Sequence, residues 1–440
     1  MICYTGWMKT FYNLLAASLL VSVTNFFVWF ALIYWIYLGT KSVISTGVVG
    51  GIFLVVTAAT GLWFGSLVDH YKKKNVMLGA SCATLLFFIL GFILYSTTPA
   101  NAFTSITSPV LWIFVMLLLG GAITGNVYGI AIPTLMTVLV PEKNRDKANG
   151  LFGTIMGISF AASNVASGFA LAFGQMYWVL IIGIVCTVIG IIYLSLIPIH
   201  ETKIIHTPEE EAQAKKVDIK GTIAAVRGIP GLMGLIFFNC FNNFLGGAFM
   251  ALMDAYGLSL VPVQVWGTLW GVLSLGFIVG GLFIAKKGLG KKPLRTLFVS
   301  NIVMWSFTIF SVMQPSIWLL AIGMGVYVCL IPFIEATEQT IIQKVVPHER
   351  QGRVFGFAQS IEQAASPLTA FLIGPITQIV FIPFMTTGAG VKLIGNWFGV
   401  GPGRGIALVF IICSMIGLVV TLLAMKTKAY AVLSERYQKH

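Results

Sequence analysis

The sequence predicts an all-α integral membrane protein whose twelve transmembrane helices form two six-helix bundles. Three observations predict this fold. Of the 440 residues, 58% are hydrophobic and only 9% are charged, whereas about a quarter of the residues in a soluble protein are charged. The chain contains twelve apolar runs that are long enough to cross a hydrocarbon layer of about 30 Å. The connectors between them alternate between basic and nearly uncharged, which is typical of membrane topology.

The twelve apolar runs fall into two sets on either side of a polar stretch. They lie at about 11–38, 44–68, 76–96, 110–137, 148–173, 176–198, 229–256, 264–285, 294–313, 316–343, 352–381 and 405–425. The first run is longer than the core of a signal peptide and has no early small-residue cleavage site, so we interpret it as a retained helix. The predicted domains are an amino-terminal bundle (1–198), a linker (199–228), a carboxy-terminal bundle (229–427) and a tail (428–440).

Lysine and arginine gather in the connectors on one predicted side of the membrane. The opposite side receives only Lys41, Lys392 and Arg404. By the positive-inside rule we expect both termini and the linker to be cytoplasmic in a multi-pass plasma-membrane protein. This pattern also accounts for the net charge of +13, so we expect no nucleic-acid partner. We interpret the linker as a solvated tether between the bundles and leave a regulatory role open.

The sequence lacks the patterns of an enzyme or a metal site. Its six cysteines are scattered singly and its five histidines lie in connectors or the tail, without metal-ligand spacing. The glycine-rich stretch 399–405 resembles a phosphate loop but follows no predicted strand, so we interpret it as a flexible connector. No nucleophile–base constellation is evident. We therefore expect a protein that is not an enzyme and needs no metal or cofactor.

An internal repeat supports the division into two bundles. The sequence Val140-Pro-Glu-Lys-Asn-Arg145 before the fifth run recurs as Val346-Pro-His-Glu-Arg350 before the eleventh. A Phe-Gly pair follows both, at Phe152-Gly153 and at Phe355-Gly356. The period of about two hundred residues indicates parallel repeats of six helices related by an axis along the membrane normal.

The loop after the second run is Gly65-Ser-Leu-Val-Asp69-His-Tyr-Lys-Lys73-Lys74. It resembles the signature loop of the major facilitator superfamily, except that His70 and Lys72 stand where the family usually has arginine and glycine. The repeat sequences, with Ala148-Asn149-Gly150 and Gly352-Arg353, resemble the drug:proton antiporter branch that includes macrolide-efflux proteins. The arginine within the fourth helix and the glycine–proline pair of the fifth, which often accompany antiport in related families, are not present in this sequence.

The resemblance implies a secondary transporter that exports small amphipathic compounds by alternating access, driven by a proton gradient. An importer or a lipid flippase of the same fold is the alternative. A third alternative, an enzyme or sensor on a transporter-like scaffold, is disfavoured because no catalytic cluster is evident. The expected partners are a small-molecule substrate and the lipid bilayer, and we expect a monomer.

The signature loop predicts a cytoplasmic latch. The glycine allows a facing helix to approach closely, and Asp69 can accept hydrogen bonds at the positive N-terminal end of a helix, here the eleventh, which starts near Gly352. A basic loop that only sets topology is the alternative. The predicted latch residues are Gly65, Asp69, Lys73, Arg145, Arg350 and Arg353.

The tenth and eleventh runs place acidic and amide residues near the middle of the membrane. Glu335 lies roughly 13 Å from Lys344, and Glu362 roughly 15 Å from Gly352, at 1.5 Å per residue. Such residues are costly in lipid, so they face the protein or a water-filled cavity. The predicted proton-coupling or substrate residues are Glu335, Glu338, Gln339, Gln359, Glu362 and Gln363. The alternatives are carboxylates permanently hydrogen-bonded to amides, and a pairing of Glu338 with Lys344.

Other polar and aromatic residues inside the runs predict the walls of a central cavity. These residues are Asn25, Trp29, Asn126, Asn242 and Asn243. Hydrogen bonding between helices is the alternative for any one of the asparagines. Asp254, near the outer end of the seventh run, is interpreted as part of a solvated helix terminus. An aromatic, uncharged wall opposite a carboxylate-bearing one suits a bulky amphipathic ligand, including a cationic one.

Overall fold

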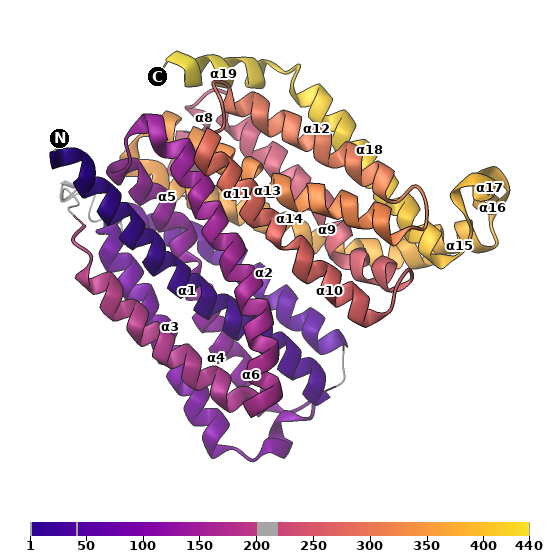
Figure 1. Cartoon of the computed structure of the whole chain (residues 1–440), viewed down its shortest axis with the longest axis horizontal. Coiled ribbons are helices and arrows are strands. Elements are labelled where there is room, and N and C mark those ends of the chain that lie inside the picture. Colours follow the sequence, from indigo (N-terminus) through magenta and orange to yellow (C-terminus); the bar gives the residue numbers. More distant parts are fainter. Residues whose placement is uncertain (1, 41–42, 200–218, 440) are drawn as a thin grey trace. The chain divides into compact units, whose positions relative to one another are not determined.

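The structure is a computed structural model that describes residues 2–40, 43–199 and 219–439. The described residues are almost entirely helical and include no β-strand (Figure 1). Twelve stretches of helix are long and apolar enough to cross a membrane. They are Met8–Ile36, Val48–His70, Lys73–Thr97, Pro109–Leu139, Glu142–Leu171, Met176–Leu196, Leu232–Leu258, Thr268–Lys287, Pro293–Ser311, Ile317–Val345, His348–Thr386 and Pro402–Ala424. The predicted all-α membrane fold with twelve spans is therefore confirmed.

Contacts between helices divide the chain into two compact units. Unit 1 comprises Met1–Ala148, Ile155–Ile223 and Val346–Ser360, and unit 2 comprises Asn149–Thr154, Ala224–Val345 and Ile361–His440. Each unit thus includes a short segment from the other side of the predicted linker. The predicted boundaries of the two bundles stay a prediction, and most of the linker, 200–218, lies outside the described residues.

Unit 1 contains the helices of the first half of the chain. They are α1 (Ile2–Thr40), α2 (Val43–His70), α3 (Lys73–Thr97), α4 (Pro109–Gly125), α5 (Val127–Leu139) and most of α6 (Arg145–Leu196), together with the start of α14 (Gln351–Ile376). α4 packs against both α1 and α3. Phe88 and Phe114 are completely buried in this packing, so the apolar surface removed from water and lipid holds the helices together.

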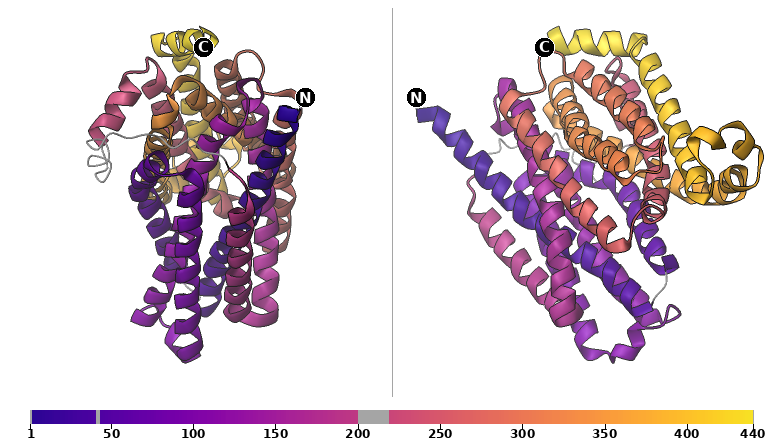
Figure 2. Two further views of the ribbon diagram at one scale, coloured as in Figure 1. Left: turned by 90° about the vertical axis from the view of Figure 1, so that its left-hand side faces the viewer. Right: turned by 45° about the vertical axis from the view of Figure 1, so that its right-hand side comes forward.

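Unit 2 contains the helices of the second half. They are α8 (Ile219–Arg227), α9 (Leu232–Leu258), α10 (Val263–Leu273), α11 (Leu275–Lys287), α12 (Pro293–Ser311), α13 (Ile317–Val345), the rest of α14, α15 (Ile382–Thr386), α16 (Ala389–Leu393), α17 (Gly395–Phe398), α18 (Pro402–Ala424) and α19 (Lys428–Lys439). α12 packs between α13 and α18. Tyr256, Trp305 and Phe410 are buried together in the resulting core. The views of Figure 2 show the long helices of each unit running alongside one another.

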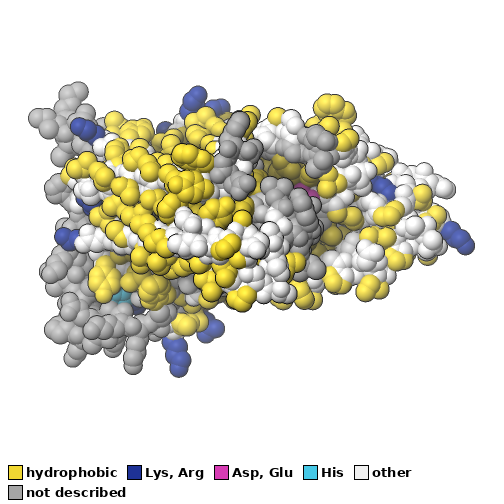
Figure 3. All heavy atoms as spheres, turned by 90° about the horizontal axis from the view of Figure 1, so that it is seen from below, with side chains coloured by type: hydrophobic (Ala, Val, Ile, Leu, Met, Phe, Trp, Pro, Cys, Tyr) yellow, Lys and Arg dark blue, Asp and Glu magenta, His cyan; other side chains and the backbone are white. Residues whose placement is uncertain are grey.

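The outward surface of the long helices suits a bilayer. Trp318 is 78% exposed and Phe371 is 82% exposed, although both are large apolar side chains. Figure 3 shows hydrophobic side chains over much of one face, with lysine and arginine at its margins. A soluble protein rarely exposes so much continuous apolar surface, so this surface is consistent with contact with lipid.

The connector before the last span differs from the sequence prediction of a flexible loop. After α14 and a short π-helix (Thr377–Phe381) the chain forms α15, α16 and α17, a small lobe that is visible beside the label of α15 in Figure 1. Arg404 is 3% exposed, lies over the ring of Phe398 at 3.8 Å, and donates to the carbonyl oxygen of Val312 at 2.9 Å. The glycines provide the positive φ angles that the turns require, as at Gly399 (92°) and Gly401 (111°). The segment is therefore an ordered cap held by a buried arginine.

Candidate functional site: a carboxylate cluster and a helix–helix latch

The acidic residues of α13 lie on the inward face of that helix. Helical periodicity places Glu335 within about 20° of Met324 and Val328 around the helix axis, and both of these side chains are buried. The strongly exposed Trp318 and Ile322 lie on a different face, about 100–140° away. The side chain of Glu335 is itself exposed, although the surrounding protein desolvates its carboxylate. Glu335 therefore borders a water-accessible space inside the protein rather than the lipid-facing surface.

Glu338 and Glu362 meet between α13 and α14. Their carboxyl groups lie within hydrogen-bonding distance of each other, and Asn239 of α9 donates through Nδ2 to Oε2 of Glu338 at 2.6 Å. Two ionised carboxylates have no proton to donate, so the contact between the glutamates is a hydrogen bond only when one of them is protonated. When both are ionised, Oε1 of Glu338 and Oε1 of Glu362 are buried without a donor.

The carboxylate cluster, defined as Glu335, Glu338 and Glu362, has no basic partner among the described residues. Glu335 is close enough to Glu338 for their charges to repel. The predicted pairing of Glu338 with Lys344 is wrong, because the ammonium group of Lys344 lies 4.3 Å from the ring centroid of Tyr437. Two nearby amide oxygens, Oδ1 of Asn239 and Oε1 of Gln339, are also buried without a donor. The cluster is thus rich in acceptors and can be satisfied by protons or by a ligand that carries donors or positive charge.

The other two amides of the predicted set contribute differently. Gln359 belongs to unit 1, where its Oε1 is buried without a donor. Gln363 is half-buried on α14, one residue from Glu362. The described residues contain no group of three His, Cys, Asp or Glu side chains that could hold a metal ion. The chemistry available at the cluster is therefore that of carboxylates and amides.

Asp69 lies at the N-terminal end of α14 within unit 1, as the signature loop predicts. Its Oδ1 accepts from the backbone N–H of Gly352 at 2.5 Å, and its Oδ2 accepts from that of Arg353 at 2.7 Å. The side chain is 1% exposed. A carboxylate that accepts two N–H groups at a helix N-terminus is favoured by direct hydrogen bonding and by the helix dipole. This arrangement has the geometry of the predicted latch, whose role is taken up under the proposed function.

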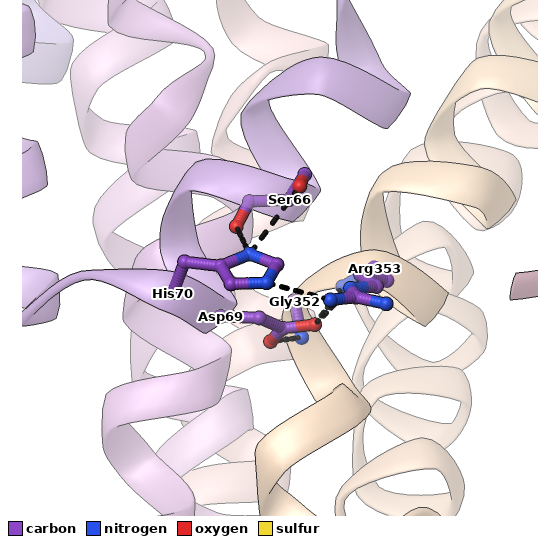
Figure 4. A network of polar contacts seen from close by, with 5 residues as sticks. All are labelled: Ser66, Asp69, His70, Gly352 and Arg353. Atoms are coloured by element: carbon purple, nitrogen blue, oxygen red, sulfur yellow. Dashed lines mark hydrogen bonds and ion pairs between the residues drawn. The ribbon is translucent and has the colours of Figure 1, made fainter. Parts of the chain in front are cut away.

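His70 adds a second link to the same helix end. Its Nδ1 is 2.8 Å from the carbonyl oxygen of Ser66, and its Nε2 is 2.7 Å from Nη2 of Arg353 (Figure 4). Because a guanidinium can only donate, Nε2 accepts and Nδ1–H donates to the Ser66 carbonyl. The histidine therefore fits this site as its neutral tautomer. Arg353 also approaches Asp69, with Nε 3.8 Å from Oδ2.

Glycine allows α2 and α14 to come this close. A Cβ atom on Gly65 would collide with the carbonyl oxygen of Gly352, and one on Gly356 would collide with that of Gly61. Lys73 is buried at the start of α3, where its charge interacts with Asp69. The remaining predicted latch residues lie elsewhere. Arg145 donates to the carbonyl oxygens of Thr137 and Val140, and the side chain of Arg350 is exposed.

A matching contact in unit 2 was not predicted from the sequence. Asn149 is 1% exposed and donates through Nδ2 to Thr340 Oγ1 at 2.8 Å and to Gln343 Oε1 at 2.9 Å. Next to it, Gly150 packs tightly against Ile284 of α11. The signal that could have found this contact is the repeat, because both repeated sequences precede a glycine that packs closely against another helix.

The predicted cavity residues make mainly contacts between helices. Asn126 donates to Thr57 Oγ1 at 3.0 Å, and Asn242 accepts from Trp305 Nε1 at 3.0 Å. Asn25 contacts Gly125 closely. Trp29 stacks on Phe53, with their ring centroids 4.4 Å apart, and Asn243 has an exposed side chain. Asn126 and Asn242 thus have the hydrogen bonds expected from the structural alternative, and whether any of the five residues contacts a ligand stays a prediction.

The sequence is similar to known transporters over most of its length. It is 22% identical to macrolide efflux protein A of Streptococcus pyogenes over 428 residues, which cover 94% of this chain and 97% of that protein. It is 23% identical over 365 residues to the inner membrane transport protein YajR of Escherichia coli (strain K12), covering 79% of this chain and 71% of that protein.

The fold is also that of solved transporters. A bacterial homologue of the iron transporter ferroportin, in an outward-facing state, matches with a TM-score of 0.70 at 14% identity, over 95% of this chain and 100% of that chain. The proton:xylose symporter XylE matches with a TM-score of 0.65 at 14% identity, over 95% of this chain and 96% of that chain. The sequence profile described as Major Facilitator Superfamily matches residues 14–370. This chain belongs to the major facilitator superfamily of membrane transporters.

Proposed function

We propose that this protein exports small amphipathic compounds by alternating access, in exchange for protons. The observation that carries the proposal is the carboxylate cluster, which lies about halfway along its helices and has no basic partner among the described residues. The likeness to macrolide efflux protein A supports export and a drug-like substrate. The cell location that we propose is the plasma membrane, with both termini in the cytoplasm.

The cluster offers a physical basis for exchange. With a proton shared between Glu338 and Glu362, the two carboxyl groups satisfy each other. Without that proton, buried oxygens lack donors, and a ligand with a positive charge or hydrogen-bond donors restores the balance. Protons and substrate therefore compete for the same oxygens. One proton moving inward supplies about 2.3 kcal/mol for each 100 mV of membrane potential.

The latch supplies the conformational part of the proposal. The bonds from Gly352 and Arg353 to Asp69 stabilise the contact between α2 and the start of α14. In the alternating cycle this contact forms when the cytoplasmic side is closed and breaks when it opens. The competition at the carboxylate cluster then decides which state is populated, because a ligand shifts an equilibrium only through its different affinity for the two states.

The test is a panel of macrolides and cationic dyes in cells that express either the native chain or Glu335→Gln. Native protein is expected to lower the accumulation of at least one compound, and Glu335→Gln is expected to lose that effect at equal expression. Glu435→Gln is the matched control, because Glu435 is exposed on α19 and lies outside the predicted spans. Accumulation that is the same with and without the native protein would refute export.

Import is the second candidate, favoured by the structural likeness to a proton:xylose symporter. The same panel distinguishes the two directions, since an importer raises the accumulation of its substrate. A compound whose entry depends on the native chain and on Glu335 would replace the proposal of export by one of uptake.

A further inference from the structure

A cavity separate from the carboxylate cluster lies within unit 2, among α9, α10, α12 and α13. Its volume is about 300 Å³, which is at the small end of the range for ligand sites in proteins. Three methionines and three aromatic residues dominate the walls. They are Met250, Met253, Met324, Phe249, Trp270 and Tyr327.

Asp254 is the only charged side chain in the lining. Its Oδ1 accepts a hydrogen bond from the indole Nε1 of Trp266 at 2.9 Å, and no basic side chain pairs with it in the described part of the chain. The side chain is exposed, as expected for a solvated helix end. It also borders the cavity, which the sequence did not indicate. The cavity therefore has a single, uncompensated negative charge at an otherwise apolar wall.

Both kinds of wall residue suit a hydrophobic cation. The faces of aromatic rings attract ammonium groups through their quadrupoles, and Trp270 and Tyr327 line the same cavity as the carboxylate. Methionine side chains are flexible and polarisable, so they adapt to ligands of different shape. Met250 is 63% exposed, which leaves apolar surface available to a ligand.

We propose that this cavity is a second binding site, for organic cations that combine an aromatic ring with a quaternary ammonium group. It lies on the same face of α13 as Glu335, and Val328 in its lining is seven residues, or about 10 Å, from that glutamate. The site is on the predicted outer side of the carboxylate cluster. The inference rests on the proposed function for the class of ligand, although binding to the site does not require transport.

Equilibrium dialysis of radiolabelled benzyltrimethylammonium against the purified full chain tests the site. Asp254→Asn keeps an oxygen acceptor for Trp266 and removes the charge, and it is expected to weaken binding roughly tenfold. Gly246→Phe is expected to abolish the same binding, because Gly246 lines the cavity and a Cβ atom there meets nothing within 4 Å. Gly271→Phe is the matched control on α10, with equally open space and no place in the lining.

Charge selectivity is tested on the unmodified chain, so that it does not depend on the folding of any variant. An excess of unlabelled benzyltrimethylammonium is expected to displace the label, and benzenesulfonate, an aromatic anion, is expected to leave it bound. Equal displacement by both compounds would overturn the proposal. Unchanged binding in both Asp254→Asn and Gly246→Phe would overturn it as well.

The failure of this inference is distinguishable from the failure of the proposed function. Loss of export in Glu335→Gln together with retained binding of benzyltrimethylammonium supports the second site. Export that depends on Glu335, together with normal binding in the Asp254 and Gly246 variants, refutes the second site alone. Charge-selective binding without export of any compound supports the site and refutes the transport proposal.

Discussion

At the scale of single residues, Asp69 and the glutamates of the carboxylate cluster are buried acids in opposite circumstances. Asp69 accepts two backbone N–H groups and has Lys73 and Arg353 nearby. The cluster has one amide donor and no basic partner among the described residues. A carboxylate satisfied by fixed donors suits a structural contact, whereas one that lacks donors suits the binding and release of protons or ligand.

Asp69→Asn is expected to weaken the contact between α2 and α14. An amide cannot accept two charge-assisted bonds at the helix end, so the loss should be about 1.5–3 kcal/mol. The measurement is the rate of maleimide labelling of Ser360→Cys in a background without other cysteines. Ser360 is 7% exposed and lies where Gly61 approaches α14, so labelling should become roughly tenfold or more faster.

The control for Asp69→Asn is Asp146→Asn, in the first turn of α6, where the carboxylate accepts from the backbone N–H of Lys147 at 2.7 Å. This change should leave the labelling of Ser360→Cys as it is in the native sequence. If Asp69→Asn and Asp146→Asn label at the same rate, the role of Asp69 as a latch is wrong.

At the scale of elements, the close packing of α2 against α14 depends on glycine at the contact. Gly65→Ala places a methyl group against the carbonyl oxygen of Gly352, and overpacking of this kind costs about 1–3 kcal/mol. The same labelling assay should show faster modification of Ser360→Cys. Gly79→Ala on α3 meets nothing within 4 Å and should have no such effect. Equal rates for the two variants would contradict the importance of close packing.

The elements themselves were largely predictable, because an apolar run of 20 residues or more has few alternatives to a transmembrane helix. The contact of Asp69 with the start of α14 was also predictable from the signature loop. The ordered lobe of α15 to α17 was not, since it depends on the burial of Arg404 over Phe398, two residues whose meeting no local pattern indicates. The same holds for the contact between Glu338 and Glu362, which come from different helices.

At the scale of the whole molecule, the family is one of transporters and not of enzymes, as expected. The direction in which the chain is inserted follows from the distribution of charge and is testable by labelling. In intact cells, Lys392→Cys should react with a membrane-impermeant maleimide, and Lys143→Cys should react only after the membrane is opened. The opposite pattern would reverse the proposed orientation.

The most direct test of the central claim is whether substrate displaces protons from the carboxylate cluster. A transported compound found in the panel is added to purified protein in weakly buffered detergent solution near pH 7, and released protons are measured with a pH-sensitive dye. The native chain and Glu435→Gln are expected to release protons on binding, and Glu335→Gln is expected to release markedly fewer. Binding without proton release in the native chain, or equal release in Glu335→Gln, would contradict the account.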